Sequence, residues 1–510
     1  MSPSHRVAVN TLILYARMGI TVLISLYTTR VILNALGAAD FGLFNVVGGA
    51  IAMLTFLNAS MAAATQRFMS YAHGEGDPGK QKSIFNVSIV LHAGIAVAVV
   101  LLLEGAGLIL FHGVFKIAPE RVHAARMIYQ FAAASTFFTI LAVPYEAVIT
   151  ARENMLVFAI LGVLEAILKL VVALYIVHWA GDKLTFYGFW MAAITILLLV
   201  LRALYCHARY TECALAPRRH FHGPLFREMT CFAGWSLLGS SSGMIANYGQ
   251  GIVINTFWGT AVNAAQGISA QVSGQLGAFA TTMQKALNPL ITKSEGAGNR
   301  PQLVRSTMTG SKIGFALLML FYVPVFLEMP FIFKLWLKEP PEYAVIFCRL
   351  LLIRNLVEQL YLTLWSAIAA SGKIRSIQIV ASVLNILPLF LSYLLFRVGL
   401  PPYVLYLAFM GYSIAMFWTA LRFASRLCDI PYTGYITGVV LPCVASILLC
   451  IGIASAPTLL YPEGLRRLAL CGAASLAAFF PVVWFFILNQ SERAAMASFS
   501  GAIRGKMKTR

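Results

Sequence analysis

Long apolar runs, each of about twenty residues or more, alternate with short polar breaks along the whole chain. Such a run is long enough to cross the hydrocarbon core of a bilayer as a helix. The breaks carry turn chemistry, for example GEGDPGK at 74–80 and KEPPE at 338–342. The pattern predicts an all-α polytopic membrane protein with about fourteen transmembrane helices. The predicted spans are residues 8–34, 41–65, 83–111, 124–149, 155–179, 184–206, 229–257, 261–287, 307–329, 342–369, 375–396, 402–424, 434–456 and 466–488.

Composition and charge agree with this assignment. Hydrophobic residues make up 59% of the chain and charged residues only 11%, too few to cover the surface of a soluble protein. The 38 Lys and Arg exceed the 19 Asp and Glu, and most of them fall in alternate loops, as the positive-inside rule expects of cytoplasmic loops. We therefore expect a multi-pass protein of the bacterial inner membrane with both termini in the cytoplasm, and no nucleic-acid partner.

The sequence repeats weakly at a shift of about 220 residues, which places Glu75-Gly76 on Glu295-Gly296 and Ala147 on Ala367. This shift equals six helices, so the orientation is preserved and the repeat is parallel. It predicts two pseudo-symmetric six-helix lobes followed by two additional helices. The predicted parts are an N-lobe at 1–206, a basic cytoplasmic linker at 207–228, a C-lobe at 229–430, and helices 13 and 14 with a basic tail at 431–510.

Motifs for catalysis or for a bound cofactor are not evident. GEGDPGK matches the start of a phosphate-binding loop, but Gln81 stands where that motif needs Ser or Thr, and a membrane helix precedes it. The eight cysteines and nine histidines form no metal-ligand spacing. We expect a protein that is not an enzyme, holds no metal or cofactor, and is driven by an ion gradient or by the membrane potential.

Charged residues inside the predicted spans are the candidates for function, because each costs about 2.5 to 3.5 kcal/mol to insert. Arg17 has no carboxylate three or four residues away, which leaves it to line a cavity or to pair with another helix. Arg30 lies near the outer end of its helix and can either snorkel to the interface or face the substrate. Glu165 and Lys169 have the spacing and order of a helical ion pair, so a structural role rivals a functional one.

Three more charges fall in the span at 342–369. Arg349 and Arg354 lie in its outer half and middle, and Glu358 follows Arg354 by one turn. Arg before Glu is the poorer order for a helical ion pair, which leaves Arg354 freer for another partner. Together the in-span charges predict a cation-lined cavity suited to an anionic group, which Arg can grip with two hydrogen bonds.

The segment NTLILYARMGITVLISLYTTRVILNALGAADFGLFNVVGG at 10–49, with QRFMSYAHGEGD at 66–77, resembles the polysaccharide-transporter or O-antigen flippase branch of the multidrug/oligosaccharidyl-lipid/polysaccharide (MOP) exporter superfamily. The resemblance covers the whole helical plan. It implies a flippase that moves undecaprenyl-diphosphate-linked oligosaccharide repeat units across the inner membrane by alternating access, for O-antigen (lipopolysaccharide) or other surface polysaccharide. Membrane lipids and a polysaccharide polymerase machinery are the further partners it implies.

By this resemblance, Arg17 and Arg30 best match the cationic cavity of such flippases. Lys169, Arg349 and Arg354 are added as cavity candidates only because of their depth within the predicted spans. Glu165 and Glu358 are candidates for ion coupling. The open alternatives are a flippase for the lipid-linked peptidoglycan precursor and a multidrug or metabolite exporter of the same superfamily. A membrane glycan polymerase is less favoured, because the external loops are short.

Overall fold

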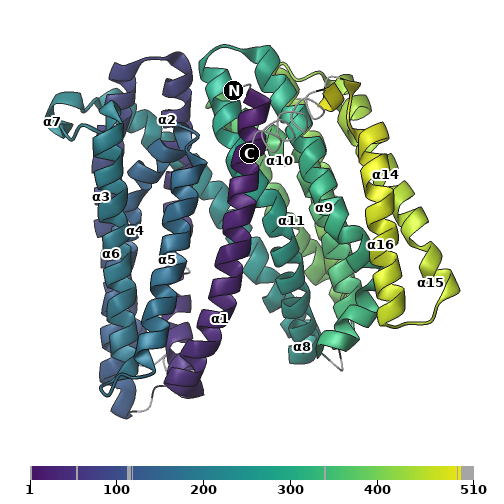
Figure 1. Cartoon of the computed structure of the whole chain (residues 1–510), viewed down its shortest axis with the longest axis horizontal. Coiled ribbons are helices and arrows are strands. Elements are labelled where there is room, and N and C mark those ends of the chain that lie inside the picture. The colour runs from purple at the N-terminus through teal and green to yellow at the C-terminus, as the bar shows by residue number, and fades with distance from the viewer. Residues whose placement is uncertain are drawn as a thin grey trace, which may run out of the picture. The chain divides into compact units, whose positions relative to one another are not determined.

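The computed structural model describes residues 3–52, 55–111, 117, 119–337, 340–490 and 492–494, which are almost entirely helical and contain no strand. The elements, with short 3₁₀ or π segments labelled η, are α1 (Pro3–Ala52), α2 (Thr55–Glu75), α3 (Pro78–Ile109), η2 (Pro119–Arg121), α4 (Val122–Ala151), α5 (Met155–Ile176), α6 (Lys183–Arg209), η3 (Thr211–Cys213), α7 (Pro217–His220), α8 (Gly223–Gly296), α9 (Arg300–Leu337), α10 (Ala344–Ser371), α11 (Arg375–Arg397), α12 (Val404–Cys428), α13 (Tyr432–Tyr435), η4 (Ile436–Val440), α14 (Leu441–Ala454), α15 (Ala456–Leu460), α16 (Leu465–Val482) and η5 (Val483–Ile487). Figure 1 shows their arrangement.

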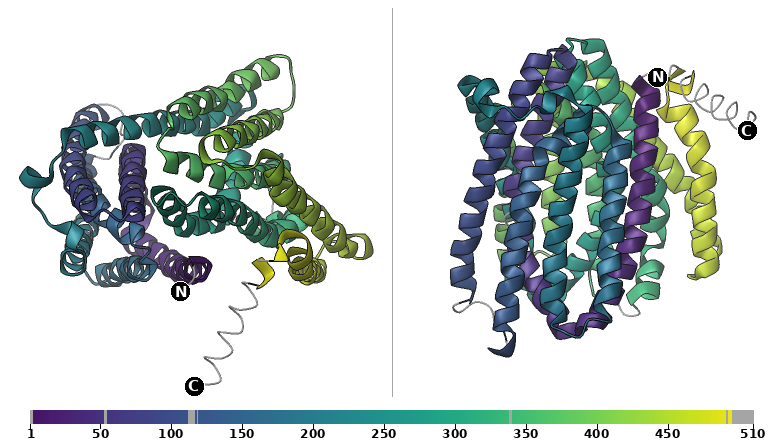
Figure 2. Two further views of the ribbon diagram at one scale, coloured as in Figure 1. Left: turned by 90° about the horizontal axis from the view of Figure 1, so that it is seen from above. Right: turned by 60° about the vertical axis from the view of Figure 1, so that its left-hand side comes forward.

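Two of these elements are each a pair of helices joined at one glycine. Gly37 in α1 has φ 78° and ψ 165°, and Gly259 in α8 has φ 74° and ψ −172°. Both conformations suit glycine, because a Cβ would clash with the backbone there. In the right-hand view of Figure 2, the purple first helix runs the length of the bundle and turns back at its far end.

Divided at these glycines, the described residues contain fourteen long helical segments, close to the predicted ranges. Ten of them are long and apolar enough to cross a membrane. The other four are more polar: 38–52 and α2, which are counted together here, 223–258, 260–296, and α10 with its three charges. The prediction of a multi-pass all-α membrane protein is confirmed.

Contacts divide the described chain into two compact units. Residues 9–237 form the N-terminal unit, and residues 238–494 with 3–8 form the C-terminal unit, so that the division falls inside α8, just after the predicted linker. In the N-terminal unit α4 packs against α2, α3 and α6, and α5 packs against α6. In the C-terminal unit α10 packs against α9 and α12, α11 packs against α12, and α14 and α16 pack against α9.

The two units repeat the same local features. The contacts of α4 with α3 and α6 recur as those of α10 with α9 and α12. The cysteine thiol near the end of α6 donates to a carbonyl of α4, and that at the end of α12 donates to the equivalent carbonyl of α10. These features fix the shift at 222 residues, close to that found in the sequence. The equivalent pairs are Gly37 and Gly259, Gly76 and Gly298, and Cys206 and Cys428.

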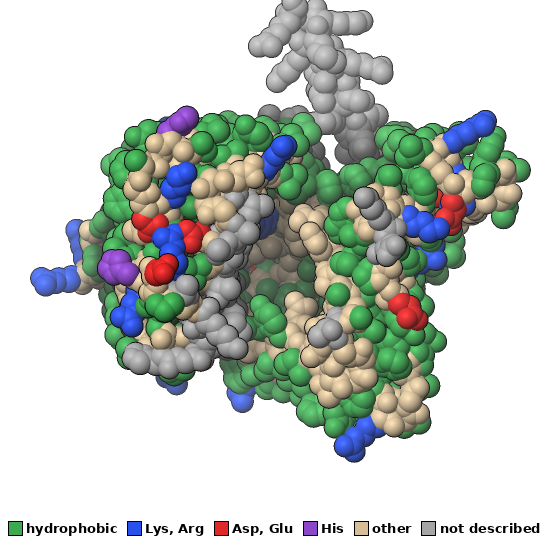
Figure 3. All heavy atoms as spheres, turned by 90° about the horizontal axis from the view of Figure 1, so that it is seen from below, with side chains coloured by type: hydrophobic (Ala, Val, Ile, Leu, Met, Phe, Trp, Pro, Cys, Tyr) green, Lys and Arg blue, Asp and Glu red, His purple; other side chains and the backbone are tan. Residues whose placement is uncertain are grey.

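One end of the N-terminal unit is tied together by charge. Arg121 forms ion pairs with Asp40, which follows the turn at Gly37, and with Asp182, which precedes α6. Burial raises the pKa of the Asp182 carboxyl, but a hydrogen bond from Thr185 and the charge of Arg121 outweigh it, so the pKa lies below its ordinary value. Figure 3 shows acidic and basic side chains side by side at this end of the unit.

Candidate functional site

Charged side chains from four helices of the N-terminal unit gather within its spans. We call this group the N-cluster: Arg17 of α1, Glu146 of α4, Glu165 and Lys169 of α5, and Arg202 of α6. Its members come together because α4, α5 and α6 pack on one another and Arg17 reaches them from α1.

Arg17 is half-buried against α5. Its guanidinium carbon lies 4.5 Å from the centre of the Phe158 ring, and the absence of a side chain at Gly162 makes room for it. A Cβ at Gly162 would stand 2.2 Å from Arg17 Nε. The carboxylates of Glu165 and Glu146 are close enough to attract the positive charge of Arg17. Among the described residues, however, no carboxylate lies within ion-pair distance of Arg17.

The other four members of the N-cluster form two ion pairs. Lys169 Nζ lies 2.7 Å from Glu165 Oε1, and Arg202 Nη2 lies 2.8 Å from Glu146 Oε1. The helical pairing expected for Glu165 and Lys169 is therefore present. With every group ionised, the two pairs cancel, and Arg17 supplies the net positive charge of the cluster.

A second cluster lies in the C-terminal unit, between α10 and α12. Arg354 Nε lies 2.7 Å from Glu358 Oε1, and the Ser413 hydroxyl contacts both, at 3.3 Å and 3.2 Å. The guanidinium also lies 4.9 Å from the centre of the Phe409 ring. Arg354 therefore pairs with Glu358 despite the poorer helical order, and it also has the further partners that this order favours, the Ser413 hydroxyl and the Phe409 ring. This second cluster has no net charge.

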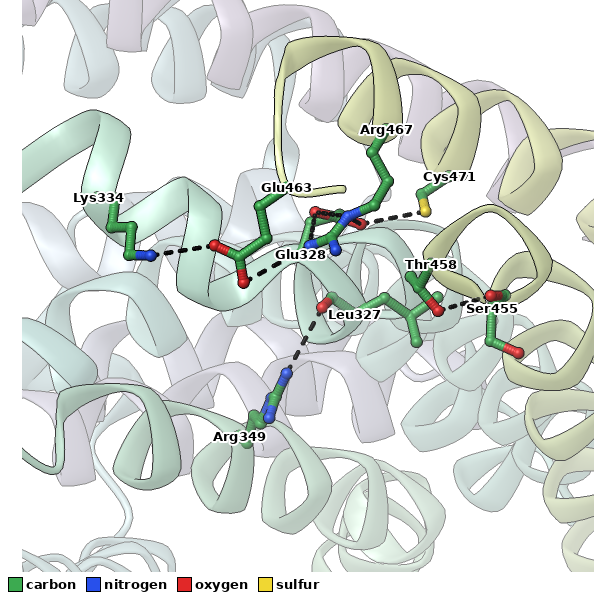
Figure 4. Close-up of polar contacts among 9 residues, drawn as sticks. All are labelled: Leu327, Glu328, Lys334, Arg349, Ser455, Thr458, Glu463, Arg467 and Cys471. Carbon is green, nitrogen blue, oxygen red and sulfur yellow. Dashed lines mark hydrogen bonds and ion pairs between the residues drawn. The ribbon is translucent and has the colours of Figure 1, made fainter. Parts of the chain in front are cut away.

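Arg349 serves the backbone of α9. Pro330 has no N–H, so the carbonyl of Phe326, four residues before it, loses its helical partner. Arg349 Nε donates to that carbonyl at 3.0 Å, and Nη2 donates to the carbonyl of Leu327 at 3.5 Å, a contact drawn in Figure 4. This contact gives Arg349 a structural role, and its predicted place in the substrate cavity stays a prediction.

Arg30 is exposed near the end of its helix, and no described residue forms a polar contact with it. This position is compatible with snorkelling to the interface, the alternative left open by the sequence. Of the predicted cationic residues, the structure thus brings Arg17 and Lys169 together in the N-cluster and leaves Arg30 apart.

Two pairs of functional interest were missed by sequence reasoning. Glu146 and Arg202 lie within predicted spans, but they pair between two helices, α4 and α6. Because the two residues are far apart in the sequence, no helical spacing could predict their ion pair. Glu328 of α9 is fully buried, and Arg467 of α16 contacts its carboxylate oxygens at 2.9 and 3.0 Å. Cys471 adds a thiol contact at 3.2 Å, so that the carboxylate is held by two side chains of α16 (Figure 4).

A metal site is not indicated by the described residues: no three or more His, Cys, Asp or Glu side chains lie close enough together to hold an ion. The carboxylates of the two clusters instead pair with Lys or Arg side chains. Within the N-cluster, the Arg17 guanidinium is the group that can offer positive charge and hydrogen-bond donors to a ligand.

The fold is similar to that of solved transporters. An outward-facing multidrug resistance MATE family transporter of the MOP superfamily matches with a TM-score of 0.71 and 15% identity, over 84% of this chain and 96% of that one. A MOP superfamily transporter from Pyrococcus furiosus, described as having a binding pocket of reverse polarity that suggests a different function, matches with a TM-score of 0.67 and 16% identity, over 83% and 97%. The MATE transporter ClbM in complex with Rb⁺ matches with a TM-score of 0.66 and 14% identity, over 82% and 96%.

These likenesses establish that the chain has the two-lobe helical fold of the MATE transporters. In sequence, no protein-family model and no curated protein matches the chain. The solved neighbours are covered almost completely, whereas about a sixth of this chain lies outside each match.

Proposed function

We propose that the chain is a flippase that moves undecaprenyl-diphosphate-linked oligosaccharides across the bacterial inner membrane by alternating access of its two units. The fold supports a transporter, and the sequence resemblance supports the lipid-linked cargo. The proposal places both termini in the cytoplasm, as the distribution of Lys and Arg indicates.

The observation that carries the proposal is the unpaired charge of Arg17. A cation within a membrane span normally pairs with an acid or faces a watery cavity. Here the two nearby carboxylates are each held by another cation, so Arg17 has hydrogen-bonding capacity left for a ligand. Phe158 and the space at Gly162 fix the guanidinium in place, which lowers the entropy lost when it binds. A diphosphate group fits such a donor, because its oxygens accept two parallel N–H bonds.

Coupling to an ion gradient or to the membrane potential follows from the proposal, with Glu165 and Glu358 as the candidate acids. Each carboxylate already has a cationic partner, Lys169 and Arg354 respectively. A proton or metal ion that drives transport would therefore have to replace one of these ion pairs. Arg354 stays a candidate for the substrate site only in a state in which its pair with Glu358 is open.

A multidrug or metabolite exporter is the second candidate, for two reasons. A solved neighbour is a multidrug resistance transporter, and the N-cluster contains two acids, Glu146 and Glu165, that a cationic substrate could contact. Both acids are occupied by cations, and the net charge of the cluster is positive, which favours the anionic cargo.

The deciding experiment is mass spectrometry of lipid extracts from a deletion strain, its parent and a plasmid-restored strain. Accumulation of a complete undecaprenyl-diphosphate oligosaccharide, with loss of the surface polymer, supports the proposal and identifies the cargo. Accumulation of the peptidoglycan precursor assigns the chain to that pathway instead. An unchanged lipid-linked pool with intact polymer rejects flipping and directs the work to export assays.

Variants of Arg17 test the site itself in the same strain. Arg17→Ala should abolish restoration of the polymer at normal membrane abundance, and Arg17→Lys should restore it in part, because a Lys ammonium keeps the charge but not the bidentate geometry. Arg305→Ala, an exposed arginine of α9, is the matched control and should restore fully. Full restoration by Arg17→Ala would remove Arg17 from the site.

The pair of Glu165 and Lys169 is tested by double neutralisation. If the pair is only structural, Glu165→Gln should impair restoration more than Glu165→Gln with Lys169→Gln, because the double variant leaves no unpaired charge in the span. If Glu165 couples an ion, the double variant stays inactive although its membrane abundance is normal.

A further inference from the structure

Between α6 and α8 the chain presents a group of exposed cations and apolar side chains. Arg218 and Arg219 of α7 are exposed, and so are Leu215 and Phe221 on either side of them, at 56% and 42%. We call these four residues the connector surface. Figure 1 shows α7 at the edge of the N-terminal unit, next to α3.

The connector surface is held rigidly in place by two buried side chains. Asn86 of α3 is fully buried; its Nδ2 donates to the carbonyl of Ala214, and its Oδ1 accepts from the amide of Ala216, both at 2.9 Å. Glu212 is 2% exposed and pairs with Arg152 at 2.7 Å, a hydrogen bond that raises the pKa of Arg152.

The cations of this region have no acidic partner. Among the described residues, no carboxylate lies within ion-pair distance of Arg218 or Arg219, nor of the exposed Arg209 and Arg227 on the flanking helices. The buried Glu212 is neutralised by Arg152. The surface is therefore strongly positive, and none of the described residues supplies its counter-charge.

The place of the surface identifies that counter-charge. The segment lies at the end of α3, whose mid-span side chains Val97 and Leu101 are exposed toward lipid at 52% and 66%. At the end of a lipid-facing helix the neighbouring molecules are phospholipid headgroups. An apolar residue beside each cation, as with Leu215 and Phe221, is the pattern of an interfacial anchor, in which the apolar group enters the acyl boundary and the cation meets the phosphate.

We propose that the connector surface binds the headgroups of anionic phospholipids and so fastens the connection between the two units to the membrane surface. Each arginine contributes about 1 kcal/mol near an anionic surface, so the pair favours charged over zwitterionic lipid. This inference does not depend on which substrate the protein moves.

The test is a thermal-shift titration of the purified full-length protein in a neutral detergent. Phosphatidylglycerol should raise the melting temperature at lower concentration than phosphatidylcholine. Arg218→Gln with Arg219→Gln should weaken the phosphatidylglycerol midpoint about thirtyfold, which corresponds to about 2 kcal/mol at 1.4 kcal/mol per tenfold. Lys373→Gln with Arg426→Gln, which removes two exposed cations from the ends of α10 and α12, is the control and should weaken the midpoint less than the variant of Arg218 and Arg219 does.

Three outcomes would overturn the proposal. Equal midpoints for the two lipids would remove the selectivity for charge. An unchanged midpoint in the variant of Arg218 and Arg219 would place the lipid elsewhere. An equal shift with soluble glycerol phosphate or with heparin would show that the surface binds a free anion or a polyanion. Phe221→Ser adds a second test, because an interfacial anchor loses affinity without its apolar group whereas an anion site does not.

Discussion

Removal of Arg467 should destabilise the protein far more than removal of a similar cation at the surface. Glu328 is fully buried and Arg467 is 12% exposed, so Arg467→Met leaves a carboxylate without its partner inside the bundle. Breaking a buried pair in this way costs about 3 to 5 kcal/mol. Arg467 lies in the first turn of α16, where water is close, so we expect a loss near about 3 kcal/mol.

The matched control is Lys334→Met, which breaks another contact between α9 and the chain just before α16. Lys334 and Glu463 are also paired at 3.1 Å, but they are 61% and 40% exposed (Figure 4). An exposed pair contributes under about 1 kcal/mol. The free energy of unfolding in mixed detergent micelles measures both variants on one scale.

A double variant separates charge from packing. Glu328→Leu with Arg467→Met removes both charges and keeps apolar volume, so it should recover most of the stability lost in Arg467→Met. Equal losses for Arg467→Met and Lys334→Met, or a double variant as unstable as the single one, would refute the reasoning that an unpaired buried carboxylate is responsible.

Two further predictions concern helix contacts. Gly162→Ala should reduce transport as much as Arg17→Ala does, because the added Cβ displaces the Arg17 guanidinium. Restoration of the polymer measures transport, and a membrane immunoblot checks that the abundance of the variant is normal. Arg349→Met should lower the melting temperature by leaving the Phe326 carbonyl without a donor, and Pro330→Ala in the same chain should reverse most of that loss by restoring the helical N–H. A double variant as unstable as Arg349→Met would contradict this role.

The sequence predicted the helices well because their signal is local. Apolar runs end at turn residues, and the glycines at 37 and 259 fall between predicted spans, where the backbone adopts a conformation that suits glycine. The repeat was also visible, although the shift from weak identities was two residues shorter than the one given by equivalent glycines and cysteines.

The site was predicted less completely because its contacts cross between helices. Depth in a span singled out Arg17 but could not show that Glu146 would be taken by Arg202. Helical spacing predicted the pair of Glu165 and Lys169 correctly, but it could not show that Ser413 and an aromatic ring of α12 would hold Arg354 beside Glu358. Such partners are far apart in the chain, so no periodicity reports them.

The ion pairs between α9 and the last helices constrain how this chain can have evolved. Besides Glu328, the nearly buried Lys312 of α9 has its partner there, Glu492 at 3.1 Å. A chain ending after α12 would leave both charges uncompensated against lipid, at several kcal/mol of insertion free energy. A chain of that length would need either uncharged residues at these two positions or other partners for the two charges. Once fixed, the two charges make the loss of the last helices costly.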